Sequence, residues 1–313
     1  MADTLHILNG DSTRQILDAA GLAGDRCVWP DVLSDGPTVL EVGSDAYWQT
    51  RRAYMTQAFD VTAAAFDEKA MGAFEQMSRL ADYQEVVLWF EYDLFCQINL
   101  ITLMHWLKGQ DRGETKISLI CVGREEGYED LVALGELPPE KYPELFERRR
   151  IMGTYDFTFA SDAYEAWCSS DPTDLDNFIL LSSNEFPYLS EVLRAHQRRF
   201  PSTQTGLTEI EEKIVEMVRS GIHSSRKIVG GLLRWQAHYG FGDLQYFQIL
   251  DRLAPLFESG EILSLKPEVE AALKQQKPIE MIDRGYFLGG AKANEWQWDV
   301  NTNELIPREI SSL

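Results

Sequence analysis

The sequence predicts an α/β protein, with a Rossmann-like open, mostly parallel sheet covered by helices and a C-terminal winged-helix-like α+β domain. Three observations predict it. Apolar runs of strand length alternate with helical patterns through the first 122 residues, and residues 86–90 form an uninterrupted apolar run, as expected for a strand covered on both faces. A polar linker at 201–206 then precedes a helix-helix-helix-wing order. We therefore expect two domains, residues 1–203 and 204–313.

The first half of the chain is expected to contain four strands, each followed by helix. The strands are predicted at residues 5–8, 27–29, 86–90 and 117–122, and the helices at 12–20, 45–59, 61–80 and 94–107. The first helix shows Ile16, Leu17 and Ala20 at helical spacing before Gly21 ends it. Such alternation favours parallel strands joined by right-handed crossovers.

The rest of the chain is predicted to be mainly helical. Residues 128–200 should form helices packed on or beside the sheet. Thr208 and Glu211 have the spacing of a capping box that opens a helix over 210–218. Two more helices, a strand and a hairpin are then expected, at 224–235, 243–257, 261–265 and 286–298.

Charge and composition narrow the classes of function. The chain has 50 acidic and 29 basic residues, a formal charge of −21, and no basic patch. Because nucleic-acid affinity depends largely on Lys and Arg contacts to phosphate, we expect no nucleic-acid partner and favour small-molecule or protein partners. No run approaches the ~18 apolar residues of a membrane span, and the N-terminus has no signal pattern, so we expect a cytoplasmic protein without membrane contact. The four cysteines are interpreted as reduced core residues.

Polar residues follow three of the predicted strands at the point where each strand ends. In open parallel sheets, ligands bind outside the carboxyl ends of the strands. The residues expected to bind a ligand are Asn9, Gly10, Ser12, Thr13, Asp31, Asp35 and Gln97. The residues expected to be catalytic are Asp11, Glu91, Asp93 and His6. Carboxylates crowded at one edge raise one another's pKa values, which lets an acid and a base coexist near neutral pH.

Each of these residues also has a structural interpretation. Asp11 or Ser12, and likewise Asp93, fit the N-cap position of the helix that follows. Asp31 and Asp35 suit a turn. His6 alternates with core residues along its strand, so it is interpreted as a core histidine unless it reaches the edge and orients Asp11. The functional interpretation depends on all of them meeting at one edge.

Cofactor motifs are mostly missing. A glycine-containing loop that leads into a helix N-terminus suits phosphate, and Asp31 lies 21 residues after Gly10, close to the roughly 20 of dinucleotide sites. The fingerprints G-x-G-x-x-G, G-x-x-x-x-G-K-[ST] and G-x-S-x-G are absent, and no compact metal-ligand spacing occurs. The cofactor therefore stays unknown, and we predict no metal.

Three segments carry a family resemblance. Residues 5–12 read LHILNGDS, residues 31–37 read DVLSDGP and residues 88–97 read LWFEYDLFCQ. They resemble a bacterial domain-of-unknown-function family with H-x-x-N-G-D-S, D-x-L-S-x-G-P and W-x-E-x-D-L-x-x-Q blocks. The C-terminal part, with YGFGDLQ at 239–245, LGG at 288–290 and WQWD at 296–299, resembles its companion unknown-function domain. The resemblance implies the architecture and the site but no activity. Gln297 departs from the basic residue expected there, which puts an anion contact at that position in doubt.

Two classes of function follow. The first is an enzyme, a hydrolase or transferase, that binds a phosphorylated or nucleotide-like small molecule, with Asp11 and Glu91 or Asp93 as acid and base. The alternative is a non-catalytic regulatory or protein-interaction protein with a winged-helix-like module, whose partner is another protein or a second copy of the chain. The predicted recognition helix at 243–257 has Arg252 as its one base, which disfavours DNA, whereas Tyr246, Phe247 and Phe257 offer either a protein contact or a core stripe.

Overall fold

The computed structural model describes residues 3–29, 31–59, 61–181, 183, 185–260 and 262–308. Its largest sheet has the strand order β2-β1-β4-β5-β6. The strands are β1 (Thr4–Leu8), β2 (Asp25–Val28), β4 (Glu85–Glu91), β5 (Lys116–Val122) and β6 (Arg150–Ile151). The first four are parallel and β6 is antiparallel to β5, so the prediction of a mixed α/β fold with a mostly parallel sheet is confirmed. The edge strand β6 was not expected, because it occupies only two residues within the region predicted to be helical.

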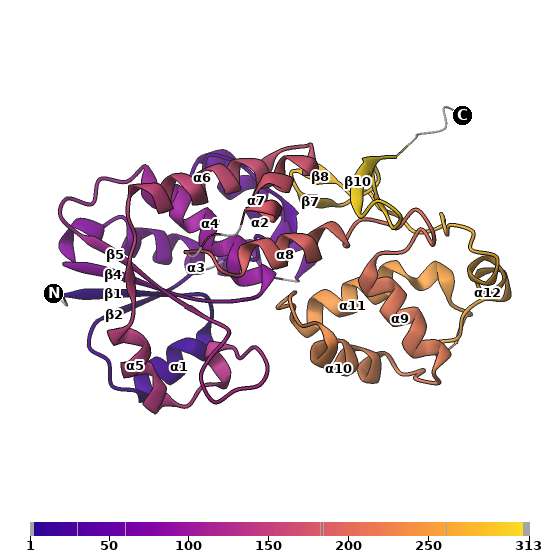
Figure 1. Cartoon of the computed structure of the whole chain (residues 1–313), viewed down its shortest axis with the longest axis horizontal. Coiled ribbons are helices and arrows are strands. Elements are labelled where there is room, and N and C mark those ends of the chain that lie inside the picture. The colour runs from indigo at the N-terminus through magenta and orange to yellow at the C-terminus, as the bar shows by residue number, and fades with distance from the viewer. Residues whose placement is uncertain are drawn as a thin grey trace.

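Helices cover both faces of this sheet (Figure 1). On one face lie α1 (Asp11–Ala19) and α5 (Tyr142–Glu147). The helices on the other face and beyond it are α2 (Asp45–Ala58), α3 (Ala63–Met77), α4 (Leu94–Lys108), α6 (Thr154–Cys168), α7 (Asp176–Leu180) and α8 (Leu189–Gln197). Short 3-10 turns occur at Leu80–Asp82, Leu134–Glu136, Pro139–Lys141, Pro172–Leu175 and Ala254–Leu256.

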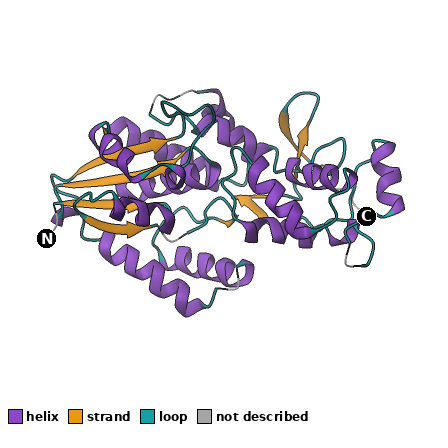
Figure 2. Ribbon diagram, turned by 90° about the horizontal axis from the view of Figure 1, so that it is seen from below, coloured by secondary structure: helices purple, strands orange, loops and turns teal. Residues whose placement is uncertain are grey.

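The residues of strand β4 show why helices are needed on both faces of the sheet. Its residues Val86, Leu88 and Phe90 belong to the larger core with α3, α4 and α6, whereas Val87 and Trp89 pack in the smaller core with α1 and α5. Successive strand residues point to opposite faces, so an uninterrupted apolar run fits only a strand buried on both sides. Figure 2 shows the strands of this sheet pointing from the N-terminal end of the molecule toward its other half, so their carboxyl ends face that half.

The C-terminal lobe, which we define as α9 to α12, contains α9 (Glu209–Arg219), α10 (Ser225–Trp235), α11 (Asp243–Arg252) and α12 (Pro267–Lys274). The rest of the described chain up to residue 200 is the N-terminal lobe. The capping box is present: Thr208 Oγ1 accepts the Glu211 N–H at 3.3 Å, and the Glu211 carboxylate accepts the Thr208 N–H at 2.8 Å. The helix expected over 243–257 ends at Arg252. In place of the strand expected at 261–265, Leu265 makes an isolated bridge to Phe257, and residue 261 lies outside the described residues.

The expected hairpin at 286–298 is replaced by two hairpins. Strand β7 (Phe287–Gly289) pairs with β8 (Ala291–Lys292), and β9 (Trp296–Asp299) pairs with β10 (Glu304–Pro307). Strand β7 also pairs in parallel with β3 (Gly36–Pro37), which lies in the loop after β2. In Figure 1 these C-terminal strands, in yellow, lie beside the helices of the N-terminal lobe. The pairing of β3 with β7 joins segments from opposite ends of the chain, which a local pattern does not reveal. The domain boundary near residue 203 stays a prediction.

Within the described residues, no helix is long and apolar enough to cross a membrane. The four cysteines are free, and Cys27 and Cys96 are buried, in agreement with their interpretation as reduced core residues. Cys121 and Cys168 are partly exposed.

Candidate functional site

The strand order places a topological switch point between β1 and β4. These two strands are neighbours, but the chain leaves β1 toward β2 on one side and leaves β4 toward β5 on the other. A crevice opens outside the carboxyl ends of such a pair of strands. Asn9 and Gly10 follow β1, and Glu91 and Asp93 lie at the end of β4. We call Asn9, Gly10, Glu91, Asp93 and Gln97 the rim.

Glu91 and Asp93 are the two predicted catalytic residues that the fold brings together. A carboxylate oxygen of each and the Cys96 sulfur all lie within 4.8 Å of one another. Asp93 is the N-cap of α4, and its Oδ1 accepts the Cys96 N–H at 2.8 Å, as its capping interpretation requires. Asp93 is 8% exposed, whereas Glu91 is only partly buried, so Glu91 is the carboxylate that solvent or a ligand reaches.

The environment of these two carboxylates shifts both pKa values upward. Burial raises the pKa of Glu91 to about 8, the charge of Asp93 adds to the rise, and hydrogen bonds from the backbone of Leu134 and Gly135 oppose it. Burial also raises the pKa of Asp93 to about 6, against the hydrogen bonds from Cys96. The expected crowding of charge is therefore present. Of the five carboxylates expected there it involves only Glu91 and Asp93, and Glu136 adds a smaller contribution.

Cys96 is a member of the site that the sequence interpretation missed. Its thiol is buried beside both carboxylates and accepts a hydrogen bond from Asn9 Nδ2 at 2.7 Å. Glu91, Asp93 and Cys96 together present three groups that can hold a divalent cation. The spacing of Asp93 and Cys96 at i and i+3 is the feature of the sequence that could have placed Cys96 in the site, because an N-cap side chain faces the third residue of its helix.

Gln97 lies at the bottom of the rim and is fully buried. Its Nε2 donates to the Glu91 backbone carbonyl at 2.6 Å and to the Cys121 sulfur at 3.4 Å. Among the described residues its Oε1 atom has no hydrogen-bond partner although it is buried. A buried carbonyl oxygen without a donor is unfavourable, so this atom is available to accept a hydrogen bond.

The turn after β1 is not capped as expected. Helix α1 begins at Asp11, and its N-cap is Gly10, which has no side chain to cap the helix, so the interpretation of Asp11 or Ser12 as the cap is wrong. Asp11 is exposed and pairs with Lys69 Nζ at 3.2 Å. Ser12 is exposed and lies against Gly135, whereas Thr13 is buried. The first turn of α1 therefore presents backbone N–H groups and the positive end of the helix dipole at the rim.

His6 lies within the core and not at the rim. It is fully buried, its Nδ1 accepts the Trp89 indole N–H at 3.1 Å and its Nε2 lies 3.1 Å from the Ala23 carbonyl. Both contacts fit one neutral tautomer with the proton on Nε2. Burial lowers its pKa, which favours that neutral form. The structural interpretation of His6 accounts for every polar atom of its ring.

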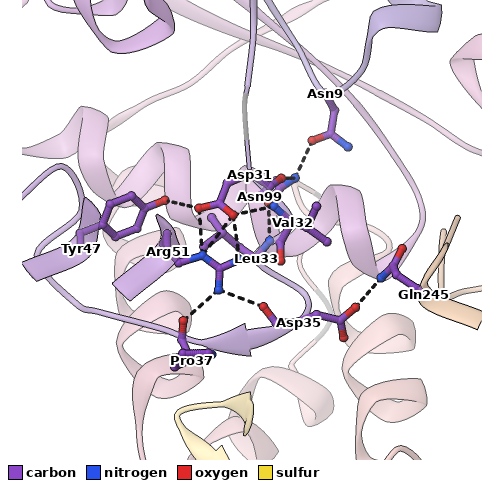
Figure 3. Close-up of polar contacts among 10 residues, drawn as sticks. All are labelled: Asn9, Asp31, Val32, Leu33, Asp35, Pro37, Tyr47, Arg51, Asn99 and Gln245. Carbon is purple, nitrogen blue, oxygen red and sulfur yellow. Dashed lines mark hydrogen bonds and ion pairs between the residues drawn. The ribbon is translucent and has the colours of Figure 1, made fainter. Parts of the chain in front are cut away.

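Asp31 is held in a buried ion pair with Arg51, a residue that the sequence interpretation did not select. Arg51 Nη2 lies 2.7 Å from Asp31 Oδ1, and Tyr47 donates its hydroxyl to Asp31 Oδ2 at 3.0 Å (Figure 3). Arg51 Nε also donates to the Asp31 carboxylate, and the donors left on Nη1 and Nη2 reach the carbonyls of Val32, Asp35 and Pro37. The Asp31 carboxylate is therefore fully occupied by protein donors, and its role is to fix the loop after β2.

Asn99 on α4 joins the loops that follow β1 and β2. Its Nδ2 donates to Asn9 Oδ1 at 2.9 Å and to the Asp31 carbonyl at 3.0 Å, and its Oδ1 accepts the Leu33 N–H at 3.3 Å (Figure 3). With Cys96 bound to its Nδ2, Asn9 also has a partner on each side of its amide. The Asn9 side chain is consequently held in a fixed position by the protein and supports the rim, and its amide is not free to bind a ligand.

Asp35 connects the two lobes. Its carboxylate accepts a hydrogen bond from Arg199, which follows α8. It accepts another from Gln245 on α11 (Figure 3). Asp35 is therefore bound to the C-terminal lobe and is not a member of the cluster of Glu91, Asp93 and Cys96. The structure separates it from the rim with which the sequence interpretation grouped it.

A loop of the C-terminal lobe packs directly on the rim. The Leu94 and Phe95 N–H groups at the start of α4 donate to the carbonyls of His238 and Tyr239, at 2.7 and 3.2 Å. Gly240 has a φ of +66° and lies so close to Asp93 that a Cβ atom there would sit 2.2 Å from the carboxyl carbon. The loop therefore accepts hydrogen bonds from the first N–H groups of α4 and covers the Asp93 side chain, which explains why Asp93 is buried.

Comparison with known proteins adds no assignment: no family model and no curated protein matches the chain.

Proposed function

We propose that the rim binds a phosphorylated or nucleotide-like small molecule and that the protein is a hydrolase or transferase in which Glu91 exchanges a proton with the ligand. The observation that carries the proposal is the pair of close carboxylates, Glu91 and Asp93, at the switch point of a parallel sheet. Ligands of open α/β folds bind at that place, and paired carboxylates of unequal pKa supply acid and base near neutral pH.

The roles of the two carboxylates follow from their exposure. Glu91 is partly exposed and has the higher pKa, so at neutral pH it carries a proton that it can donate to a leaving group. Asp93 is buried under Gly240 and acts through its charge, which holds the Glu91 proton in place. Asp93 is therefore a positioning residue in this proposal, and Glu91 is the group that contacts the substrate.

The start of α1 supports an anionic ligand. Gly10 leaves the first N–H groups of the helix without a side-chain cap, and Gly10 itself is partly exposed. Free N–H groups at a helix N-terminus and the helix dipole both stabilise a phosphate. This anion position lies next to β4, because β1 and β4 are paired strands.

Two near-isosteric variants test the proposal. Glu91→Gln and Asp93→Asn remove the titrating groups, while Asn still serves well as an N-cap. Hydrolysis of p-nitrophenyl phosphate and of bis(p-nitrophenyl) phosphate would be followed from pH 5 to 9, together with thermal shifts in the presence of phosphate, AMP and ADP. Glu140→Gln, an exposed change in a nearby turn, is the control.

We expect at least one phosphate compound to be hydrolysed or to raise the melting temperature. Glu91→Gln should then lose activity by about 10²-fold or more, the usual contribution of a general acid. Asp93→Asn should keep activity but move its alkaline limit to lower pH. If no compound affects the wild type, or if both variants match Glu140→Gln, the rim is structural and the proposal is wrong.

We further propose that the C-terminal lobe is winged-helix-like, since α9, α10 and α11 are followed by the bridge between Phe257 and Leu265. A regulatory role through DNA is not favoured by the position of α11, whose residues Gln245 and Gln248 bond to the N-terminal lobe. Tyr246 and Phe257 are buried, so they belong to the core and do not offer a protein contact. A gel shift at low salt tests this: tight, salt-sensitive DNA binding would contradict it.

We also propose that the chain is a member of the unknown-function family whose three blocks it resembles. Asn9, Asp31 and Gln97 come from the three separate blocks, and each is buried with hydrogen bonds that fix the rim or its neighbouring loop. A structural need shared by family members would explain why these residue types recur together.

A further inference from the structure

A cavity of about 650 Å³ lies between the two lobes, apart from the rim. We call it the interlobe cleft. From the N-terminal lobe it is lined by β3 and by α2 residues such as Tyr54 and Gln57. From the C-terminal lobe it is lined by α11, including Arg252. The segment that contains Tyr286, which follows that lobe in the chain, completes the lining. Its volume falls in the range of pockets for small organic molecules, roughly 300–1,000 Å³.

Three of the arginines in and around the interlobe cleft are already neutralised by a buried or half-buried acid. Arg51 pairs with Asp31, Arg199 with Asp35 and Arg284 with Glu211. Of these paired residues, Asp35, Arg199 and Glu211 line the interlobe cleft, where the side chains of Asp251 and Arg252 also lie.

Arg252, at the end of α11, is different. Among the residues that the structure describes, no acid pairs with its guanidinium, and its Nε is buried without a hydrogen-bond partner. Its Cζ lies 4.6 Å from the centre of the Tyr286 ring. Asp251 lines the same cleft, but within the described ranges it forms no ion pair with this partly buried cation. Burying an N–H donor without an acceptor is unfavourable, so a ligand oxygen placed beside Arg252 Nε would be stabilised.

Tyr54 and Gln57 give the interlobe cleft two more groups for a ligand. The Tyr54 ring packs on Gly36 and under the Arg51 guanidinium, which fixes its position. Within the described part of the chain, neither the Tyr54 hydroxyl nor the Gln57 amide has a hydrogen-bond partner. Burial raises the pKa of Tyr54 and the charge of Asp35 adds to the rise, whereas the charges of Arg51, Arg199 and Arg252 oppose it.

We propose that the interlobe cleft binds a small organic oxyanion with a flat ring, whose carboxylate or phosphate group pairs with Arg252. A planar guanidinium presents paired donors that match the two oxygens of such a group. The aromatic side chains Tyr54, Phe241 and Tyr286 supply ring surfaces against which a flat body packs. The ligand bridges α2 and α11, and therefore holds the two lobes together. This site is separate from the rim and does not depend on the function proposed for it.

Binding of four probes to the full chain tests the proposal by calorimetry. AMP and nicotinate each combine a ring with an oxyanion, as phosphate and as carboxylate. Adenosine has the ring without the anion, and inorganic phosphate the anion without the ring. We expect AMP or nicotinate to bind, with adenosine and phosphate at least about tenfold weaker, and whichever anion binds identifies the natural group.

Three variants locate the bound probe. Arg252→Gln should weaken binding by about tenfold or more, as expected for loss of a charge-assisted hydrogen bond, and Arg252→Lys should retain part of the affinity. Tyr54→Phe should weaken binding without changing the packing of its ring. Arg226→Gln removes an exposed positive charge from α10 of the same lobe and should bind like the wild type.

Three results would overturn the inference. One is the absence of binding by both AMP and nicotinate to the wild type. A second is equal binding by Arg252→Gln and Arg226→Gln. Loss of AMP binding in Glu91→Gln but not in Arg252→Gln would also overturn it, since the ligand then lies at the rim.

Discussion

Arg51 and Asp31 form an ion pair from which solvent is almost completely excluded: the two side chains are 0% and 2% exposed, and Nη2 lies 2.7 Å from Oδ1. The pair lies beneath the loop after β2, and every donor of the guanidinium is used. It connects α2 to the loop that carries Asp35, so the loop reaches the C-terminal lobe in a fixed conformation.

Replacing Arg51 should therefore destabilise the protein strongly. Arg51→Ala leaves the Asp31 carboxylate buried without its cation, and we expect a loss of about 3–5 kcal/mol in the free energy of unfolding. The matched control is Arg52→Ala, because the next residue in α2 pairs with Asp67 at the surface, where both side chains are about 40% exposed. That change should cost less than about 1 kcal/mol. Urea unfolding measures both, and equal losses would refute the structural role of the buried pair.

The raised pKa of Glu91 should make stability depend on pH. Between its ordinary value of 4.5 and about 8, the folded protein holds a proton that the unfolded chain releases, so the free energy of unfolding falls as pH rises through this window. Glu91→Gln lacks this titration. Its melting temperature relative to the wild type should rise between pH 5 and pH 9 by more than about 3 °C, roughly the effect of 1 kcal/mol. The melting temperature of Glu140→Gln relative to the wild type should not change with pH. If neither variant shows a pH-dependent difference from the wild type, the burial of Glu91 is contradicted.

Asn99 should stabilise two loops at once. Asn99→Leu keeps the volume but leaves Asn9 Oδ1, the Asp31 carbonyl and the Leu33 N–H without their partner. Each buried group left unpaired costs about 1–3 kcal/mol.

The control for Asn99 lies one helical turn further along α4. Thr102→Val removes a buried hydroxyl that donates to the Ile98 carbonyl of its own helix at 2.8 Å, its one hydrogen bond within the described ranges. The change should therefore cost about 1 kcal/mol. Guanidinium unfolding compares the two variants. Asn99→Leu should be the less stable, and the opposite order would show that the loops do not depend on Asn99.

Gly240 should tolerate no side chain. Its φ of +66° disfavours an L-residue, and a Cβ atom would collide with the Asp93 carboxylate. Gly21 has a similar φ of +70° with nothing within 4 Å of the Cβ position, so Gly21→Ala carries the backbone cost alone, about 1–2 kcal/mol. Gly240→Ala should lose clearly more stability and expose residues 236–242 to limited proteolysis. Similar behaviour of the two variants would mean that this loop does not pack on the rim.

The features that sequence predicted well are those fixed by neighbours along the chain. The alternation of apolar residues located the strands, and short-range spacing found the Asp93 cap and the Thr208 capping box. The sequence predicts Asp11 or Ser12 as the N-cap of α1, because Asp and Ser are favoured at that position. The N-cap is instead Gly10, and a glycine without a capping side chain leaves no mark in the sequence pattern.

The features that sequence missed depend on residues far apart in the chain. Asn99 and Asn9 are 90 residues apart, and Gln245 and Asp35 are 210 residues apart. A turn residue such as Asp31 looks the same in sequence whether it faces solvent or a buried arginine. The partner decides whether a polar residue binds a ligand or supports the fold, and only the three-dimensional structure supplies the partner.

The pairing of β3 with β7 bears on how the protein is made. During synthesis, Gly36 and Pro37 leave the ribosome about 250 residues before their partners Leu288 and Gly289. The large parallel sheet uses only the first 151 residues and can assemble early, but the edge at β3 must wait for nearly the whole chain. Contacts of such long sequence separation are slow to form. A nascent chain that stalls after residue 203 would therefore hold a finished sheet beside an open edge, the kind of exposed segment that chaperones bind.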